Sequence, residues 1–190
     1  MTIVLAGVAA LTYAVFASSI VLVFRQHDSA SPAGLRLIKF GAVATAVCEV
    51  WAIVAAPPPT ATRTAIALAA FAGSLALYAA SAHANRGRPL TLAFSSDVPV
   101  HLVEHGPYRI VRHPFYAAYL LSYLAGWVGS WNHWLWLAIA AMLTLYAAAA
   151  TREERKFLGS EFASAYEAYK ARTGMLIPTF GLGLGTRSRS

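Results

Sequence analysis

Side chains able to do chemistry gather in two short segments of this chain. Residues 103–116 read VEHGPYRIVRHPFY, and residues 151–178 open with TREE and end at a proline. Carboxylates can bind ammonium groups or hydroxyls, and arginines bind carboxylates through paired donors. Tyrosine rings attract cations through their faces. The two segments therefore predict a binding site for a charged or polar small molecule.

Backbone signals in the first segment place some of these side chains. Gly106-Pro107 is typical of a turn, and Pro114 suits the first turn of a helix, where its missing N–H has no partner to lose. His113 then lies beside a helix N-terminus, where amide donors favour an anionic ligand group. The segment predicts a turn followed directly by a helix that starts at the site.

The composition indicates which elements must hold this site. Hydrophobic residues make up 58% of the 190 residues and charged residues 12%, about half the charged share of a soluble globular protein. Mean hydropathy is +0.54. So much apolar surface requires lipid, which excludes a disordered tail protein and an ordinary cytosolic enzyme. The single cysteine, Cys48, excludes an internal disulfide framework and so a disulfide-rich secreted scaffold.

Five charge-poor runs approach the roughly 20 residues that a helix needs to cross the ~30 Å hydrocarbon layer. The first could instead be a signal peptide, but it has no basic n-region and its apolar stretch is too long. The last two are joined by a short polar stretch and predict a helical hairpin. Glu49 lies inside the second run, where a carboxylate usually faces a protein interior or cavity. We expect it to hydrogen-bond another helix while protonated, and the alternative is contact with substrate. The five expected spans are residues 2–24, 40–56, 64–82, 115–130 and 134–150.

Charge and tryptophan placement predict the orientation of these spans. Fourteen of the fifteen lysines and arginines lie in segments on one side of the membrane, and Arg63 is the exception. The positive-inside rule then places the N-terminus outside and the C-terminus in the cytoplasm. All five tryptophans fall near the opposite, outer interface, as in an aromatic belt. A hairpin that leaves the cytoplasmic face and returns to it brings residues 103–116 and 151–178 together.

The two segments also carry a motif. Gly-Pro-Tyr-Arg-x-x-Arg-His-Pro-x-Tyr at residues 106–116 is followed by the hydrophobic hairpin, a Glu-Glu pair, Phe-x-x-x-Tyr-x-x-Tyr and a closing proline. This pattern resembles the isoprenylcysteine carboxyl methyltransferase family and the related phospholipid methyltransferases, over roughly residues 83–178. The resemblance implies an integral-membrane enzyme that holds S-adenosylmethionine under the final hairpin, near the cytoplasmic face.

The resemblance also assigns roles to single residues. It implies that Glu153 or Glu154 closes the cofactor site and that Glu154 takes part in catalysis, and Arg172 keeps the family's place after Tyr169. We expect Arg172 to orient or neutralise a substrate carboxylate. The remaining residues implied to bind the cofactor are Tyr108, Arg112, His113, Pro114 and Tyr116.

Two positions depart from the family pattern. Ala118 stands where members usually have glycine, and the Glu-Glu pair lies nine and eight residues before Phe162 instead of eight and seven. One residue of register rotates a helix by about 100°. Which glutamate faces the pocket is therefore open, and Glu154 keeps the better spacing.

The sequence thus predicts an all-α, polytopic membrane protein of about five transmembrane helices with an additional cytoplasmic helix from Thr151 through Arg172 to Pro178. Its expected parts are a three-helix membrane region (1–82), a catalytic region (83–178) and a flexible tail (179–190). The Ala-rich composition favours a bacterial inner-membrane protein. The oligomeric state stays open.

The predicted activity is S-adenosylmethionine-dependent methyl transfer to a carboxylate, thiol or amine of a lipophilic small molecule, at the cytoplasmic face. Membrane lipids are the expected surroundings, and no nucleic-acid segment is seen, since basic residues do not alternate with exposed aromatics in a water-soluble stretch. The histidines lack metal-ligand spacing with Cys48, and we expect no metal. The alternatives are an NADPH-dependent membrane reductase, because sterol reductases carry a similar His-Pro-x-Tyr region, and a non-catalytic membrane scaffold.

Overall fold

The protein is all-helical in the part of the chain that the computed structural model describes, which is residues 1–22, 33–86, 99 and 101–179. Within these residues no strand forms, and one isolated bridge joins Val111 to Gly174. The prediction of an all-α fold is confirmed. The helices are α1 (Thr2–Leu22), α2 (Ala33–Ala55), α3 (Ala61–Ala84), α4 (Pro114–Ser130), α5 (Leu135–Leu158) and α6 (Ala163–Arg172), with a short 3-10 helix η1 (Gly106–Arg109).

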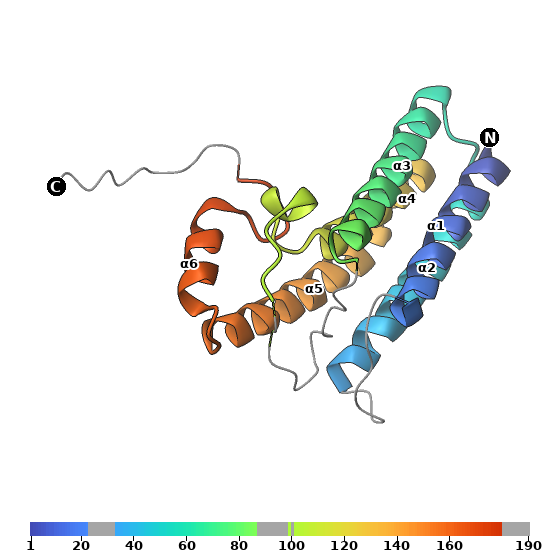
Figure 1. The fold of residues 1–190 in the computed structure, drawn as a ribbon. Helices are drawn as coiled ribbons and strands as arrows, with labels where there is room; N and C mark the ends of the chain where they lie inside the picture. The colour runs from blue at the N-terminus through green and yellow to red at the C-terminus, as the bar shows by residue number, and fades with distance from the viewer. Residues whose placement is uncertain (23–32, 87–98, 100, 180–190) are drawn as a thin grey trace.

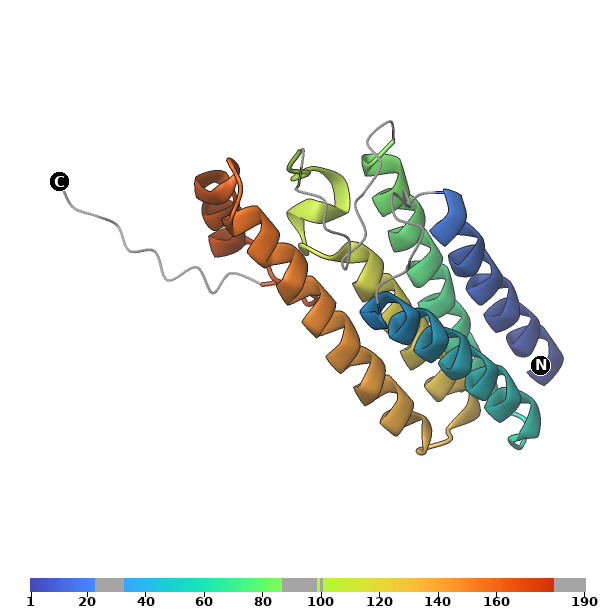
Figure 2. The same ribbon diagram turned by 90° about the horizontal axis from the view of Figure 1, so that it is seen from below.

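Helices α1 to α5 lie alongside one another in a single bundle (Figures 1 and 2). The most extensive packing is between α3 and α4, and α2 contacts both α4 and α5. Helix α6 turns away from the bundle beside the end of α5, at the same end as η1. The bundle therefore carries a separate small assembly of η1, α6 and the start of α4 at one end.

Three of the helices, α2, α3 and α5, are long and apolar enough to cross a membrane, and Thr2–Ser18 of α1 is a shorter apolar stretch. Helix α4 has 17 residues. The outside of the bundle exposes large apolar side chains such as Ile3, Phe40 and Trp134. Such a surface suits lipid and not water. The count of five spans and their orientation remain predictions.

The expected helix after Thr151 is wrong in two respects. Helix α5 continues two turns past the apolar run, to Leu158, and the chain then breaks at 159–162 before α6. Gly159 caps α5, and the Ser160 hydroxyl accepts a hydrogen bond from the Phe162 amide at 3.2 Å. Such local side-chain bonds compete with helix. Helix α6 also ends at Arg172, before the predicted limit at Pro178.

Glu49 is completely buried where α1, α2 and α4 meet. Tyr13 of α1 donates a hydrogen bond to its carboxyl group, and a Cβ at Gly126 of α4 would collide with the same group. Tyr13 also lies 3.4 Å from the carbonyl of Ser122. Glu49 thus hydrogen-bonds another helix, with its carboxyl group as the acceptor, and Gly126 lets α4 approach the carboxyl closely. The expected protonation of Glu49 stays a prediction.

The bundle end away from η1 gathers aromatic side chains around Arg63. The Arg63 guanidinium donates to the carbonyls of Val128 and Gly129 at 3.2 and 2.9 Å, and it lies 5.2 Å from the ring of Trp131. Trp131 stacks on Trp127 with ring centroids 4.9 Å apart. Arg63 thus binds carbonyls left without partners at the end of α4.

Candidate active site

The start of α4 is held by a short parallel backbone pairing. The Arg112 amide donates to the carbonyl of Gly174 at 2.8 Å, and the His113 amide donates to that of Met175 at 3.0 Å. Pro114 then begins α4 with His113 as its N-cap residue. A Cβ at Gly174 would collide with the carbonyl of Ile177, so only glycine fits this tight turn. The pairing fixes the Arg-His-Pro motif against the chain that follows α6.

The two glutamates at the end of α5 point to different partners. Glu154 is buried and accepts from Arg112 Nε at 2.8 Å, and its second oxygen lies 3.5 Å from Lys170 Nζ. Glu153 accepts a hydrogen bond from the Tyr116 hydroxyl at 2.8 Å. His113 lies between the two carboxylates. The adjacent positions diverge because successive helical residues are rotated by about 100°.

Helix α6 and η1 close the site through buried hydrogen bonds. The Tyr169 hydroxyl donates to the carbonyl of Tyr108 at 2.6 Å, and Asn85 at the end of α3 donates to the Tyr108 hydroxyl at 2.8 Å. Arg112 also donates to the carbonyls of Thr173 and, at 3.3 Å, Lys170. Arg112 thereby joins the start of α4 to α5 and to the end of α6.

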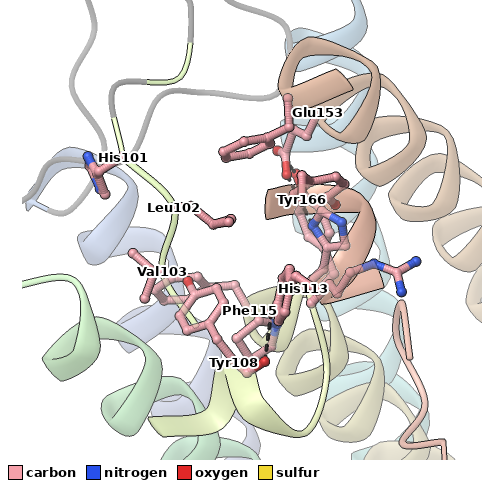
Figure 3. Close-up of a pocket in the computed structure, with 13 residues that line it drawn as sticks. His101, Leu102, Val103, Tyr108, His113, Phe115, Glu153 and Tyr166 are labelled. Atoms are coloured by element: carbon pink, nitrogen blue, oxygen red, sulfur yellow. Dashed lines mark hydrogen bonds and ion pairs between the residues drawn. The ribbon is translucent and has the colours of Figure 1, made fainter. Parts of the chain in front are cut away.

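These elements line a partly open cavity of about 110 Å³. Figure 3 shows labelled side chains around it: His101 to Val103 on one side, Tyr108 and Phe115 below, and Glu153 and Tyr166 opposite. The lining is mostly aromatic, with Glu153 as its carboxylate. The lining residues are His101, Leu102, Val103, Tyr108, Arg112, His113, Pro114, Phe115, Tyr116, Glu153, Phe157, Tyr166 and Tyr169.

Most of the side chains expected to bind the cofactor or to take part in catalysis line this one cavity. The two exceptions are Glu154, which lies behind Arg112, and Arg172, which is exposed and pairs with Glu104 at 2.7 Å. The glutamate with the better family spacing is thus the one outside the lining. The expected residues that line the cavity are Tyr108, Arg112, His113, Pro114, Tyr116 and Glu153.

Other lining residues were not anticipated at the site. Residues 101–103 carry no motif, and sequence alone gives no signal for them. Phe157 lies one helical turn after Glu153, which places it on the same face of α5. Tyr166 and Tyr169 belong to the Phe-x-x-x-Tyr-x-x-Tyr part of the motif, and in the structure both are buried and also line the cavity.

Groups outside the spans have shifted pKa values, and His113 and Tyr108 are two of them. Burial lowers the pKa of His113, but the hydrogen bonds and charges of Glu153 and Glu154 outweigh burial, so the net pKa lies above its ordinary value. Burial raises the pKa of the Tyr108 hydroxyl above its usual range. Tyr108 is therefore protonated at neutral pH, and the two carboxylates shift His113 towards its protonated form.

The cavity chemistry fits a cationic ligand that also carries polar groups. A carboxylate at the wall can pair with an ammonium or accept from hydroxyls, and aromatic faces stabilise cations. The volume is below the roughly 300 Å³ at which pockets for drug-sized ligands begin. A ligand of that size therefore requires the cavity to widen. Among the described residues, no cluster of histidine, cysteine, aspartate or glutamate side chains could hold a metal ion.

Comparison with known families defines the class of protein. Residues 61–165 match the phospholipid methyltransferase family, a span of more than half the chain that runs from the start of α3 into α6. The protein belongs to this family, and it is therefore an integral-membrane methyltransferase. Neither the curated proteins nor the solved structures include a match to the chain.

Proposed function

We propose that this protein transfers a methyl group from S-adenosylmethionine to an amine of a lipophilic molecule at the cytoplasmic face of a bacterial inner membrane. One observation carries the proposal: Glu153, His113 and Tyr116 converge in an aromatic-lined cavity between the two ends of the α4–α5 hairpin. The family match supplies the reaction class. Bound S-adenosylmethionine supplies a methyl group already activated on a sulfonium.

The side chains of the cavity suit such a cofactor. Glu153 offers a carboxylate to an ammonium or to ribose hydroxyls, and Tyr108, Tyr116 and Phe157 offer ring faces to a cation. Each cation–π contact contributes on the order of 0.5–2 kcal/mol. Arg112 and Glu154 instead stabilise the wall of the cavity, since they form a buried ion pair with each other. Transfer of an activated methyl group depends mainly on alignment and the exclusion of water, which buried walls provide.

The charges of the cavity favour an amine among the three acceptor classes. A carboxylate acceptor needs a cation to orient it, but the lining cations Arg112 and His113 already pair with carboxylates. Arg172, the other candidate, pairs with Glu104 outside the lining. Glu153 also pairs with His113 and accepts from Tyr116, but a carboxylate has about four acceptor sites. It can therefore still meet a cationic headgroup beside the aromatic rings. The amine must lose a proton to react, and Glu153 is the carboxylate of the lining that can accept it.

Calorimetry on the purified protein tests the cofactor. We expect S-adenosylhomocysteine to bind wild type, and Glu153→Gln to weaken binding about tenfold or more, because hydrogen bonds to charged groups contribute roughly 1.5–3 kcal/mol. Glu161→Gln, at an exposed position near α6, is the matched control and should bind as wild type does. Binding of NADPH with no binding of S-adenosylhomocysteine would reject the proposal in favour of a reductase.

Methyl transfer from labelled S-adenosylmethionine tests the acceptor. We expect label in phosphatidylethanolamine vesicles, and none in a prenylcysteine carboxylate or a long-chain thiol. His113→Ala should abolish the transfer. Label in the carboxylate or thiol alone would contradict the choice of an amine and keep the methyltransferase assignment.

A further inference from the structure

We infer that His113 is an imidazolium that bridges Glu153 and Glu154, and that it is the positioning residue that directs Glu153 into the cavity. The second half of this inference rests on the proposed function, because it takes Glu153 to be the carboxylate that meets the ligand. The first half, the charge of His113, stands on the geometry of the side chains alone.

Both ring nitrogens of His113 face carboxylate oxygens. Nδ1 lies 3.1 Å from Glu153 Oε2, and Nε2 lies 3.3 Å from Glu154 Oε1. An ionised carboxylate only accepts hydrogen bonds, and a neutral imidazole donates from one nitrogen only. A neutral ring would therefore point a lone pair at one carboxylate. The His113 side chain is 10% exposed, so water does little to screen the repulsion between that lone pair and the carboxylate. Protonation of both nitrogens replaces the repulsion with a second hydrogen bond.

The ring is also fixed in orientation. It stacks on Tyr116 with centroids 5.8 Å apart, and Tyr116 stacks on Tyr146 with centroids 5.0 Å apart. The backbone of His113 is tied on both sides, since its amide donates to Met175 and its carbonyl accepts from Ala117 at 3.1 Å. The imidazolium is therefore held in the plane that meets both carboxylates.

The two carboxylates beside His113 differ in their other hydrogen-bond and ion-pair partners. Glu154 has Arg112 and Lys170 as further cationic partners, whereas the hydroxyl of Tyr116 is a neutral donor to Glu153. Loss of the His113 proton thus weakens the interactions that orient Glu153 more than those that orient Glu154. The charged and titratable groups around the ring are Arg112 from its own segment, Tyr116 from α4, Glu153 and Glu154 from α5, and Lys170 and Tyr166 from α6.

This arrangement gives His113 a role different from ligand binding through its nitrogens. Both N–H groups are used within the protein, so the ring contributes charge and orientation. The bridge also keeps two adjacent carboxylates in place, whose mutual repulsion would otherwise favour protonation of one of them. Glu153 then keeps its place at the cavity wall.

Nuclear magnetic resonance of protein with ¹⁵N-labelled histidine, in micelles and without ligand, tests the charge. We expect both ring nitrogens of His113 to be protonated at pH 7.5, with deprotonation well above the ordinary histidine pKa of about 6.5. The signal is assigned by its absence in His113→Gln or, if that variant does not fold, by elimination among the other five histidines. A neutral ring at pH 7 would overturn the inference.

Binding of S-adenosylhomocysteine across pH 6 to 9.5 tests the positioning role. We expect wild-type affinity to fall, about tenfold or more, over the pH range in which His113 loses its proton. His113→Gln should bind weakly with no such dependence, while His105→Gln, at an exposed position on the same segment, should follow wild type. A pH profile shared by wild type and His113→Gln would refute the positioning role. Absence of any binding by wild type would refute the proposed function, and the resonance measurement would still decide the charge.

Discussion

Replacement of Arg112 by methionine tests how strongly the site is tied together. The Arg112 and Glu154 side chains are 7% and 4% exposed and lie 2.8 Å apart. Removing one partner of a buried ion pair costs about 3–5 kcal/mol, because the other charge stays buried without compensation. Glu154 keeps His113 and Lys170 as partners. The free energy of unfolding should therefore fall by an amount near the lower limit of that range, about 3 kcal/mol. Methionine retains an unbranched apolar stem, so lost packing adds little.

Thermal unfolding followed by tryptophan fluorescence in detergent measures this loss. For a chain of 150–250 residues, each kcal/mol lowers Tm by roughly 2–4 °C, so Arg112→Met should lower Tm by about 6–12 °C. Arg109→Met, three residues away and exposed, is the matched control and should change stability by no more than about 0.5 kcal/mol.

A double-mutant cycle with Glu154→Gln separates the pair from other effects of the substitution. We expect a coupling energy of about 1–3 kcal/mol between Arg112 and Glu154, since residues in direct contact couple within this range. A Tm for Arg112→Met within 2 °C of wild type, or a coupling energy near zero, would refute the assignment of Arg112 as the residue that joins α4 to α5.

Three further changes have expected outcomes. Gly126→Ala should destabilise the fold by about 1–3 kcal/mol, because the added Cβ collides with the Glu49 carboxyl. Gly73→Ala is the control, since its Cβ makes an ordinary contact 3.7 Å from a leucine methyl, and its Tm should stay close to that of wild type. Equal Tm values for the two variants would contradict the close packing at Gly126. Tyr169→Phe removes the donor of a buried 2.6 Å hydrogen bond and should cost about 1–3 kcal/mol, and an unchanged midpoint would show the bond to be unimportant. The raised pKa of His113 stabilises the fold fully below about pH 6.5, and this contribution is lost as pH rises through the raised pKa. The Tm gap between wild type and His113→Gln should therefore close towards alkaline pH, and a constant gap would disagree.

Much of the helical fold follows from apolar composition, but one boundary did not. The apolar run of the last span stops at Ala150, yet α5 continues to Leu158. Residues 151–158 form helix because their polar side chains find partners at the bundle end, such as Arg112 for Glu154. Hydropathy reflects burial in lipid and gives no information about such polar contacts. The break at Gly159 had a visible signal, since glycine often follows the last turn of a helix.

Six of the thirteen lining residues are among those expected from the motif, but the spacing of the motif did not indicate that Glu153, and not Glu154, lines the cavity. Spacing along a chain does not define the rotation of a helix about its axis, which depends on packing against α4 and α6. The pairing of Arg112 with Gly174 also has no sequence signal, because it joins residues 62 positions apart through backbone atoms. Any residue types other than proline at the two donor positions could form those bonds, except at Gly174 itself, where a Cβ does not fit.

The backbone pairing of Arg112 and His113 with Gly174 and Met175 has a consequence for biosynthesis. A chain made from its N-terminus completes the α4–α5 hairpin before residues 174 and 175 exist. During that interval the Arg-His-Pro segment has no backbone partner, and Arg112 lacks the carbonyls of Lys170 and Thr173. The site therefore acquires its final wall only when the segment after α6 docks. A ribosome stalled before residue 174 would leave a membrane-inserted protein with its active site unfinished.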